Sequence, residues 1–155
     1  MPVLDLMDLP AALPRHAPLA GLDLGEKTIG VAVSDIGLMI ATPLTLIRRT
    51  RFTADAEALA KLMDARGAAG LVIGLPVNMD GTEGPRCQSV RAFARNLMRR
   101  QDLPIAFWDE RLSTAAVNRM LIAEADTTRA RRAELVDKAA AAWILQGALD
   151  RLRGG

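Results

Sequence analysis

Four acidic side chains are the residues of this chain best placed to do chemistry. Asp23 lies among apolar residues at the end of an expected strand, Asp109 and Glu110 follow another, and Asp137 lies in an expected helix. A buried, unpaired carboxylate is costly, so it normally has a hydrogen-bond donor or a cation beside it. Carboxylate oxygens suit Mg²⁺ and Mn²⁺, which can activate water for phosphodiester hydrolysis. If the acids converge, they predict metal-dependent cleavage of a phosphodiester.

Each acid also has a plainer explanation. Asp23 could accept hydrogen bonds from the N–H groups of the following turn, or pair with Lys27. Asp137 could lie in a first helical turn, where an acidic side chain interacts favourably with the helix dipole, and the acids at 109–110 could simply precede a helix. Other catalytic sets are missing, because the sole histidine is His16 and no Cys–His or Ser–His–Asp combination is present.

The apolar pattern predicts the elements that would position these acids. Ala20 to Leu24 and Ile29 to Val33 are separated by a glycine-bearing turn typical of a tight hairpin. Further strands are expected over 39–47, 70–74 and 104–108. We expect helices after Thr53 and Ser113, which would act as N-caps, from Pro85, and over about 133–149.

A three-stranded meander followed by strand–helix alternation indicates an α/β fold. It predicts one mixed five-stranded sheet, in the order 3-2-1-4-5, with helices on its faces. Strands one, four and five then run parallel, and their carboxyl ends meet at one edge, where ligands of open α/β sheets generally bind. Residues 1–18 contain several prolines and are expected to be a flexible leader outside a single domain over 19–152.

Composition favours a cytoplasmic protein with an anionic partner. The chain has neither the basic, apolar start of a secretion signal nor a stretch able to span a bilayer, and its single cysteine, Cys87, is expected in the core. Seventeen of its 20 basic residues are Arg, whose planar fork suits phosphate. With no Tyr to stack on bases, a nucleic acid would be bound mainly through its backbone.

Several polar side chains are candidates for contacting phosphate. The loop before the helix at Pro85 could hold an anion at the helix N-terminus, and a purely structural turn is the alternative. A basic loop over 124–132 could close over a charged backbone or only be solvated. The candidates in these segments and in the hairpin turn are Lys27, Asn78, Arg86, Arg91, Arg129, Arg131 and Arg132.

Four blocks of the sequence resemble the YqgF/RuvX family, small RuvC-like members of the RNase H-like superfamily. The first runs from Leu22-Asp-Leu-Gly to Val-Ser-Asp35, and the second contains Gly74-Leu-Pro and its following loop. The others begin Asp109-Glu-Arg and Val136-Asp-Lys. The blocks lie at residues 22–35, 72–85, 109–114 and 136–145.

The resemblance implies an RNase H-like fold and a cytoplasmic nuclease that matures the 5′ end of pre-16S rRNA during ribosome biogenesis. Its acids correspond to Asp23, Glu110 and Asp137, which would hold one or two Mg²⁺ or Mn²⁺ ions. Asp109 competes for the middle place, because adjacent strand residues point to opposite faces. Cleavage of Holliday junctions in DNA repair, a non-catalytic nucleic-acid module and an ATP-binding protein are the rivals. The substrate is then pre-rRNA or branched DNA, with a monomer or a weak homodimer both open.

Overall fold

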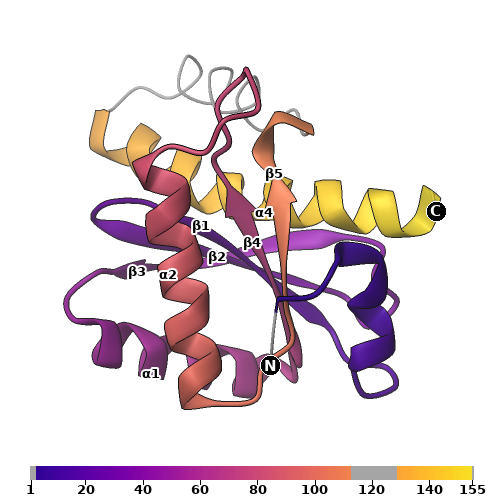
Figure 1. Ribbon diagram of the computed structural model, residues 1–155. Coiled ribbons are helices and arrows are strands. Elements are labelled where there is room, and N and C mark those ends of the chain that lie inside the picture. Colours follow the sequence, from indigo (N-terminus) through magenta and orange to yellow (C-terminus); the bar gives the residue numbers. More distant parts are fainter. Residues whose placement is uncertain (1–2, 113–128, 155) are drawn as a thin grey trace.

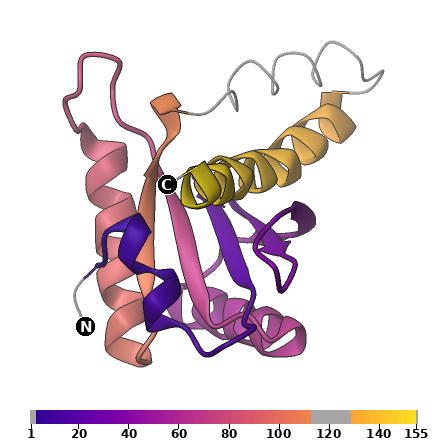
Figure 2. The ribbon, with the colours of Figure 1, turned by 90° about the vertical axis from the view of Figure 1, so that its right-hand side faces the viewer.

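The computed structural model describes residues 3–112 and 129–154, apart from the side chains of 129–138. A single sheet forms the middle layer of the molecule (Figures 1 and 2). Helices α1 (Phe52–Arg66) and α2 (Pro85–Arg100) pack on one face, and α4 (Arg129–Gly154) crosses the other. The predicted helix after Ser113 lies outside the described residues.

The sheet has the predicted topology, with strand order β3-β2-β1-β4-β5. Central β1 pairs antiparallel with β2 and parallel with β4, and β4 pairs parallel with β5. The carboxyl ends of β1, β4 and β5 therefore meet at one edge, which confirms the expected placement. The strands are β1 (Leu19–Leu24), β2 (Thr28–Ser34), β3 (Ala41–Arg48), β4 (Gly70–Leu75) and β5 (Ile105–Asp109).

Two helix starts differ from the prediction. Helix α1 begins at Phe52 without a side-chain cap, so Thr53 is not its N-cap; instead the buried carboxylate of Asp55 accepts a hydrogen bond of 3.1 Å from the Thr50 N–H. Helix α4 already includes Arg129, which was expected in a loop. The residues from there to 133 are only Arg and Ala, which are among the best helix formers, and neither Gly nor Pro interrupts them.

Small residues let α4 lie close to the sheet. A Cβ added to Gly147 would lie 2.9 Å from the Trp108 ring, and one added to Gly21 would lie 2.7 Å from the Leu145 Cβ. Ala141 and Ile144 are fully buried in the same layer. Cys87 is buried in the opposite layer, as predicted. Among the described helices, none is long and apolar enough to cross a membrane.

The N-terminal segment is part of the fold, so the prediction of a leader outside it is wrong for the described residues. The Leu4 N–H donates to the Ile105 carbonyl over 2.8 Å, which extends the sheet beyond β5. Leu6 and Leu9 are buried against the core beneath α4, and the segment lies beside β5 (Figure 1). Its prolines limit the chain's freedom but do not prevent the leucines between them from packing.

We expect Leu9→Ala to lower the free energy of unfolding by about 2–5 kcal/mol, because it removes a fully buried side chain and leaves a cavity. Met7→Ala in the same segment is the control; its side chain is 42% exposed, and a change within about 0.5 kcal/mol is expected. Urea denaturation of both variants measures the difference. Equal, small effects would mean that the segment does not belong to the cooperative core.

Candidate functional site

Asp23 lies at the carboxyl end of β1, on the face that α4 covers. Its neighbours Leu22 and Leu24 pack in the core on the α1/α2 side, and successive strand residues point to opposite faces. Asp23 is half-buried and pairs in register with Gly30 of β2. The β1–β2 hairpin therefore presents this carboxylate beside α4, near the edge where the parallel strands end.

Gly74 of β4 makes room for a second carboxylate on this face. A Cβ at this position would lie 3.3 Å from the Glu110 carboxyl carbon and 2.5 Å from Ile144 Cδ1 of α4. Glu110 directly follows β5, two residues beyond Trp108, which pairs with Gly74. The Glu110 carboxyl group therefore lies over β4, and β4 is the strand between Glu110 and Asp23 in the sheet order.

Asp109 is held differently from Glu110. In β5, Phe107 packs with the core on the α1/α2 side and Trp108 with that on the α4 side, so alternation directs Asp109 away from α4. Arg111 binds both carboxylate oxygens of Asp109, with Nη2–Oδ2 at 2.7 Å and Nε–Oδ1 at 3.1 Å. These hydrogen bonds hold the pKa of Asp109 below its ordinary value. Both oxygens of Asp109 are thus already paired with a cation.

Asp137 lies within α4, two helical turns before Ile144, and its side chain is outside the described residues. No group of three or more His, Cys, Asp or Glu able to hold a metal occurs among the side chains that the structure does describe. The donor chemistry nevertheless fits Mg²⁺ or Mn²⁺, because Asp23 and Glu110 offer hard oxygens on one face. The Glu110 carboxyl group and the Ile144 side chain both lie over Gly74, on the face to which Asp23 points.

The loop after β4 is held together by its own polar groups. The Asn78 side-chain amide donates to Thr82 Oγ1 over 3.0 Å, and Asp80 Oδ1 accepts from the Thr82 N–H over 2.9 Å. Hydrogen bonds from Thr82 hold the pKa of Asp80 below its ordinary value. The amide of Asn78 thus has the structural role that was the alternative to phosphate binding.

The remaining phosphate candidates are in different environments. Arg91 forms an ion pair with Glu83, with Nε–Oε1 at 2.7 Å, and its guanidinium lies over the Phe107 ring, 5.1 Å from the centroid. Lys27 is exposed on the hairpin turn and makes no side-chain hydrogen bond or ion pair with the rest of the described chain. Arg129, Arg131 and Arg132 lie in α4, and their side chains are outside the described residues.

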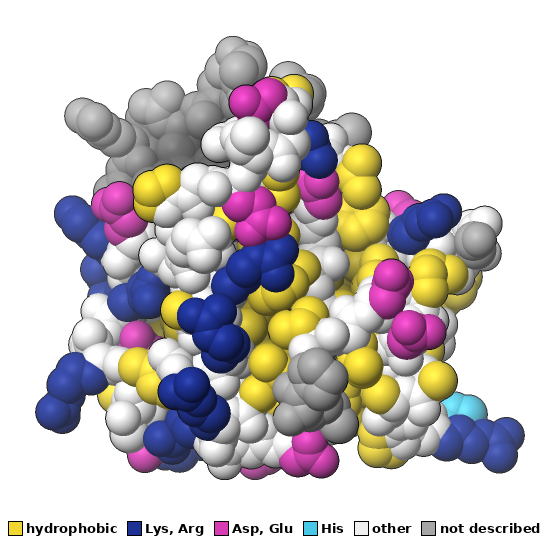
Figure 3. All heavy atoms as spheres, in the orientation of Figure 1, with side chains coloured by type: hydrophobic (Ala, Val, Ile, Leu, Met, Phe, Trp, Pro, Cys, Tyr) yellow, Lys and Arg dark blue, Asp and Glu magenta, His cyan; other side chains and the backbone are white. Residues whose placement is uncertain are grey.

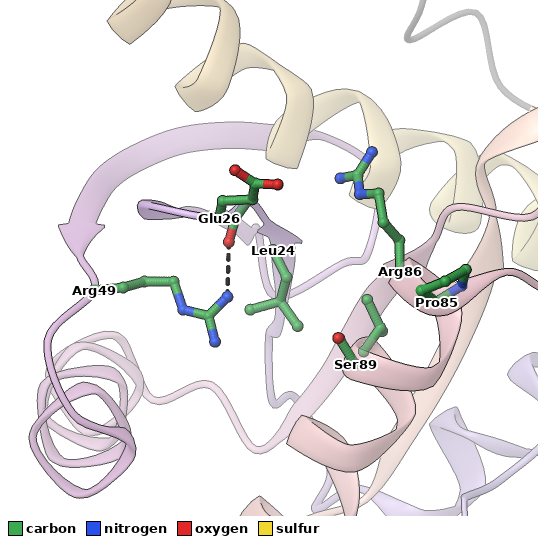
Figure 4. A pocket seen from close by; sticks show the side chains of 8 residues that line it. Leu24, Glu26, Arg49, Pro85, Arg86 and Ser89 are labelled. Atoms are coloured by element: carbon green, nitrogen blue, oxygen red, sulfur yellow. Dashed lines mark hydrogen bonds between the residues drawn. The ribbon is translucent and has the colours of Figure 1, made fainter.

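Arg86 lines a cleft between the hairpin turn and the start of α2 (Figure 4). The cleft has a volume of about 260 Å³, and Arg49 forms its other basic wall. Sequence reasoning missed Arg49. Its position just after the third strand of the meander was the available signal, because the end of that strand lies near the turn between the first two strands. In the structure the Arg49 N–H donates to the Lys27 carbonyl over 2.8 Å.

Known proteins resemble this chain over nearly its whole length. A relative from Phenylobacterium zucineum is 75% identical and one from Caulobacter vibrioides 67%, each over 99% of both chains; both are named as candidate pre-16S rRNA nucleases. Thermus thermophilus RuvC, solved in complex with a Holliday junction substrate, has the same fold, with a TM-score of 0.55 and 12% identity over 90% of this chain and 97% of RuvC. The family model RuvX, described as Holliday junction resolvase, matches residues 17–151. The resemblance seen in the sequence is thus confirmed, and the chain belongs to the RuvX family.

Proposed function

We propose that this protein is a metal-dependent nuclease that cleaves phosphodiester bonds of structured nucleic acid, acting on the 5′ end of pre-16S rRNA. The observation that carries the proposal is the placement of Asp23 and Glu110 on one face of the sheet, where Gly74 of the intervening strand lets the Glu110 carboxyl group lie over β4. The names of the full-length relatives support the rRNA substrate.

Asp23, Glu110 and Asp137 are the proposed metal ligands. Helical periodicity places position 137 on the line of α4 that continues through Ala141 and Ile144, both of which are buried against the sheet. Asp109 is the weaker candidate, because strand alternation directs its side chain away from α4, where Arg111 binds it. A third acid from α4 would thus approach the edge at which the other two meet.

The proposed ligands would hold the metal ion at the edge of the sheet, where it would act on the phosphodiester. When bound, Mg²⁺ or Mn²⁺ supplies a Lewis acid that lowers the pKa of water and offsets negative charge on the leaving oxygen. The β1–β2 pairing fixes the backbone of Asp23, and Glu110 directly follows the last paired residue of β5, so the backbone holds both residues at this edge before substrate binds. Positioning of this kind reduces the cost of reaching the reactive arrangement.

Cleavage of Holliday junctions is the second candidate. The description of the matching family model favours it. The same acids would serve both substrates, because the two reactions hydrolyse the same type of bond. A non-catalytic module is less favoured, because this chain has a carboxylate at all three positions at which the family resemblance places its acids.

We expect Asp23→Asn and Glu110→Gln each to reduce the cleavage rate by about 100-fold or more, because each removes a proposed metal ligand. Mutating a residue that only hydrogen-bonds to a metal ligand already reduces metal affinity or activity by about 10–100-fold. Asp109→Asn is the matched control and should keep most of the activity. The assay measures cleavage of labelled 5′-extended 16S rRNA precursor and of a four-way DNA junction, with Mg²⁺, with Mn²⁺ and with a chelator.

The substrate that is cut identifies the pathway, and loss of cleavage with chelator tests the need for metal. Binding of the uncut substrate should survive in both variants, since they do not remove positive charge. Full activity in Asp23→Asn would overturn the assignment of the acids. A larger loss in Asp109→Asn than in Glu110→Gln would exchange their roles.

Gly74→Ala should slow cleavage about ten-fold and lower the free energy of unfolding by about 1–3 kcal/mol, because the added methyl group meets the Ile144 side chain and the Glu110 carboxyl group. Gly154→Ala is the control, since nothing lies within 4 Å of a Cβ there. Cleavage rates and thermal melting report the two effects separately. A stable, fully active Gly74→Ala variant would show that this position does not constrain Glu110.

A further inference from the structure

The cleft beside Arg86 begins where β1 ends, on the other side of the sheet from the acids. Leu24 lines the cleft and packs toward the α1/α2 core, whereas the preceding residue, Asp23, points toward α4. The Cα atoms of consecutive residues are only about 3.8 Å apart. A ligand that crosses the end of β1 would therefore reach both the cleft and the acidic edge.

Two cations and a hydroxyl group face this cleft from opposite sides (Figure 4). Arg49 comes from the segment after β3, and its Nη1 donates to the Gly25 carbonyl over 2.7 Å. It also lies over the Phe93 ring, 5.8 Å from the centroid, so its guanidinium is fixed from two directions. Arg86 and Ser89 come from the first two turns of α2.

The side chains of Arg86 and Ser89 have no partner in the described chain: neither forms a side-chain hydrogen bond, and Arg86 forms no ion pair. Glu26 also lines the cleft, but it is not ion-paired with Arg49 or Arg86 within the residues described. The Arg86 fork is thus available to an anion, in contrast to Arg91, which Glu83 occupies. Arg side chains also gather along α2 on the face shown in Figure 3.

The rest of the cleft is apolar. Leu24, Pro85 and Val90 contribute to its walls. Cations and a hydroxyl group beside an apolar surface match a sugar-phosphate unit, because a guanidinium can bind phosphate oxygens through two hydrogen bonds while the ribose packs on aliphatic carbon. A free inorganic anion would not use the apolar part.

We propose that this cleft binds one sugar-phosphate unit of the substrate strand next to the bond that is cleaved, with Arg49, Arg86 and Ser89 contacting its phosphate. The inference rests on the proposed nuclease function and adds to it a backbone subsite on the α2 side of the same sheet edge. Contacts to phosphate position a strand without reading its sequence. The cleft therefore sets which bond reaches the acids by its distance from them.

The test measures binding of fluorescently labelled 5′-extended 16S precursor RNA by anisotropy, without divalent metal, in an Asp23→Asn background that prevents cleavage. Arg86→Ala should weaken binding about ten-fold and reduce the slope of log K against log salt by about one, as expected for one lost phosphate contact. Arg95→Ala is the matched control, because Arg95 is an exposed arginine of α2 that does not line the cleft. It should change binding less than two-fold.

A second pair of variants changes shape without changing charge. Ser89→Leu would fill part of the cleft and should also weaken binding about ten-fold, whereas Gln88→Leu, at the neighbouring exposed position outside the cleft, should not. Thermal melting checks that all variants fold. Equal losses in Arg86→Ala and Arg95→Ala, unchanged binding in Ser89→Leu, or no RNA binding at all would each overturn the subsite.

The results of this binding test distinguish a failure of the proposed cleft from a failure of the proposed nuclease activity. Metal-dependent cleavage together with equal effects of Arg86→Ala and Arg95→Ala would leave the nuclease standing and remove the cleft. Selective loss of binding in Arg86→Ala without any cleavage by the unaltered chain would keep the cleft as a nucleic-acid site and remove the catalytic proposal.

Discussion

Parallel pairing of β1 with β4 and of β4 with β5 brings the ends of three strands to one edge of the sheet, and the candidate site depends on this arrangement. Side chains then alternate between two faces, so one residue step decides whether a carboxylate points toward α4 or away from it. Asp23 and Glu110 lie on the α4 side, and Asp109 lies on the other. Without the glycine at position 74, the Ile144 side chain and the Glu110 carboxyl group could not keep these positions above β4.

The two faces of this edge have different chemistry. The α4 face carries half-buried carboxylates beside a tightly packed helix, whereas the α2 face carries a cleft lined by two arginines, Glu26 and apolar side chains. Ion pairs of Arg91 with Glu83 and of Arg111 with Asp109 hold these side chains near the edge, so both arginines already have a carboxylate partner. Arg49 and Arg86 have no such carboxylate partner in the described chain, which is why they, and not the other arginines nearby, are assigned to the substrate backbone.

The sequence predicts the sheet order well, because the meander and the following strand–helix alternation leave few topologies. It fails where packing overrides local composition. The prolines near the N-terminus indicated a free segment, but Leu6 and Leu9 fill the core beneath α4. Thr53 is a residue type that often caps helices, but α1 begins before it, and the Asp55 carboxylate accepts a hydrogen bond from the Thr50 N–H instead. The choice between Asp109 and Glu110 could not be made from their order alone, and Arg49 was missed because its role arises from contacts between segments distant in the chain.

Anomalous diffraction from crystals of this chain grown with Mn²⁺ would show whether Asp23 and Glu110 hold a metal ion together. We expect a manganese peak on the α4 side of the sheet, within about 2.5 Å of an oxygen of both Asp23 and Glu110. The peak should be lost in Asp23→Asn and kept in Asp109→Asn. A peak beside Asp109 on the α2 side, or no ordered manganese at this edge at saturating concentration, would show that these two acids are not the metal ligands.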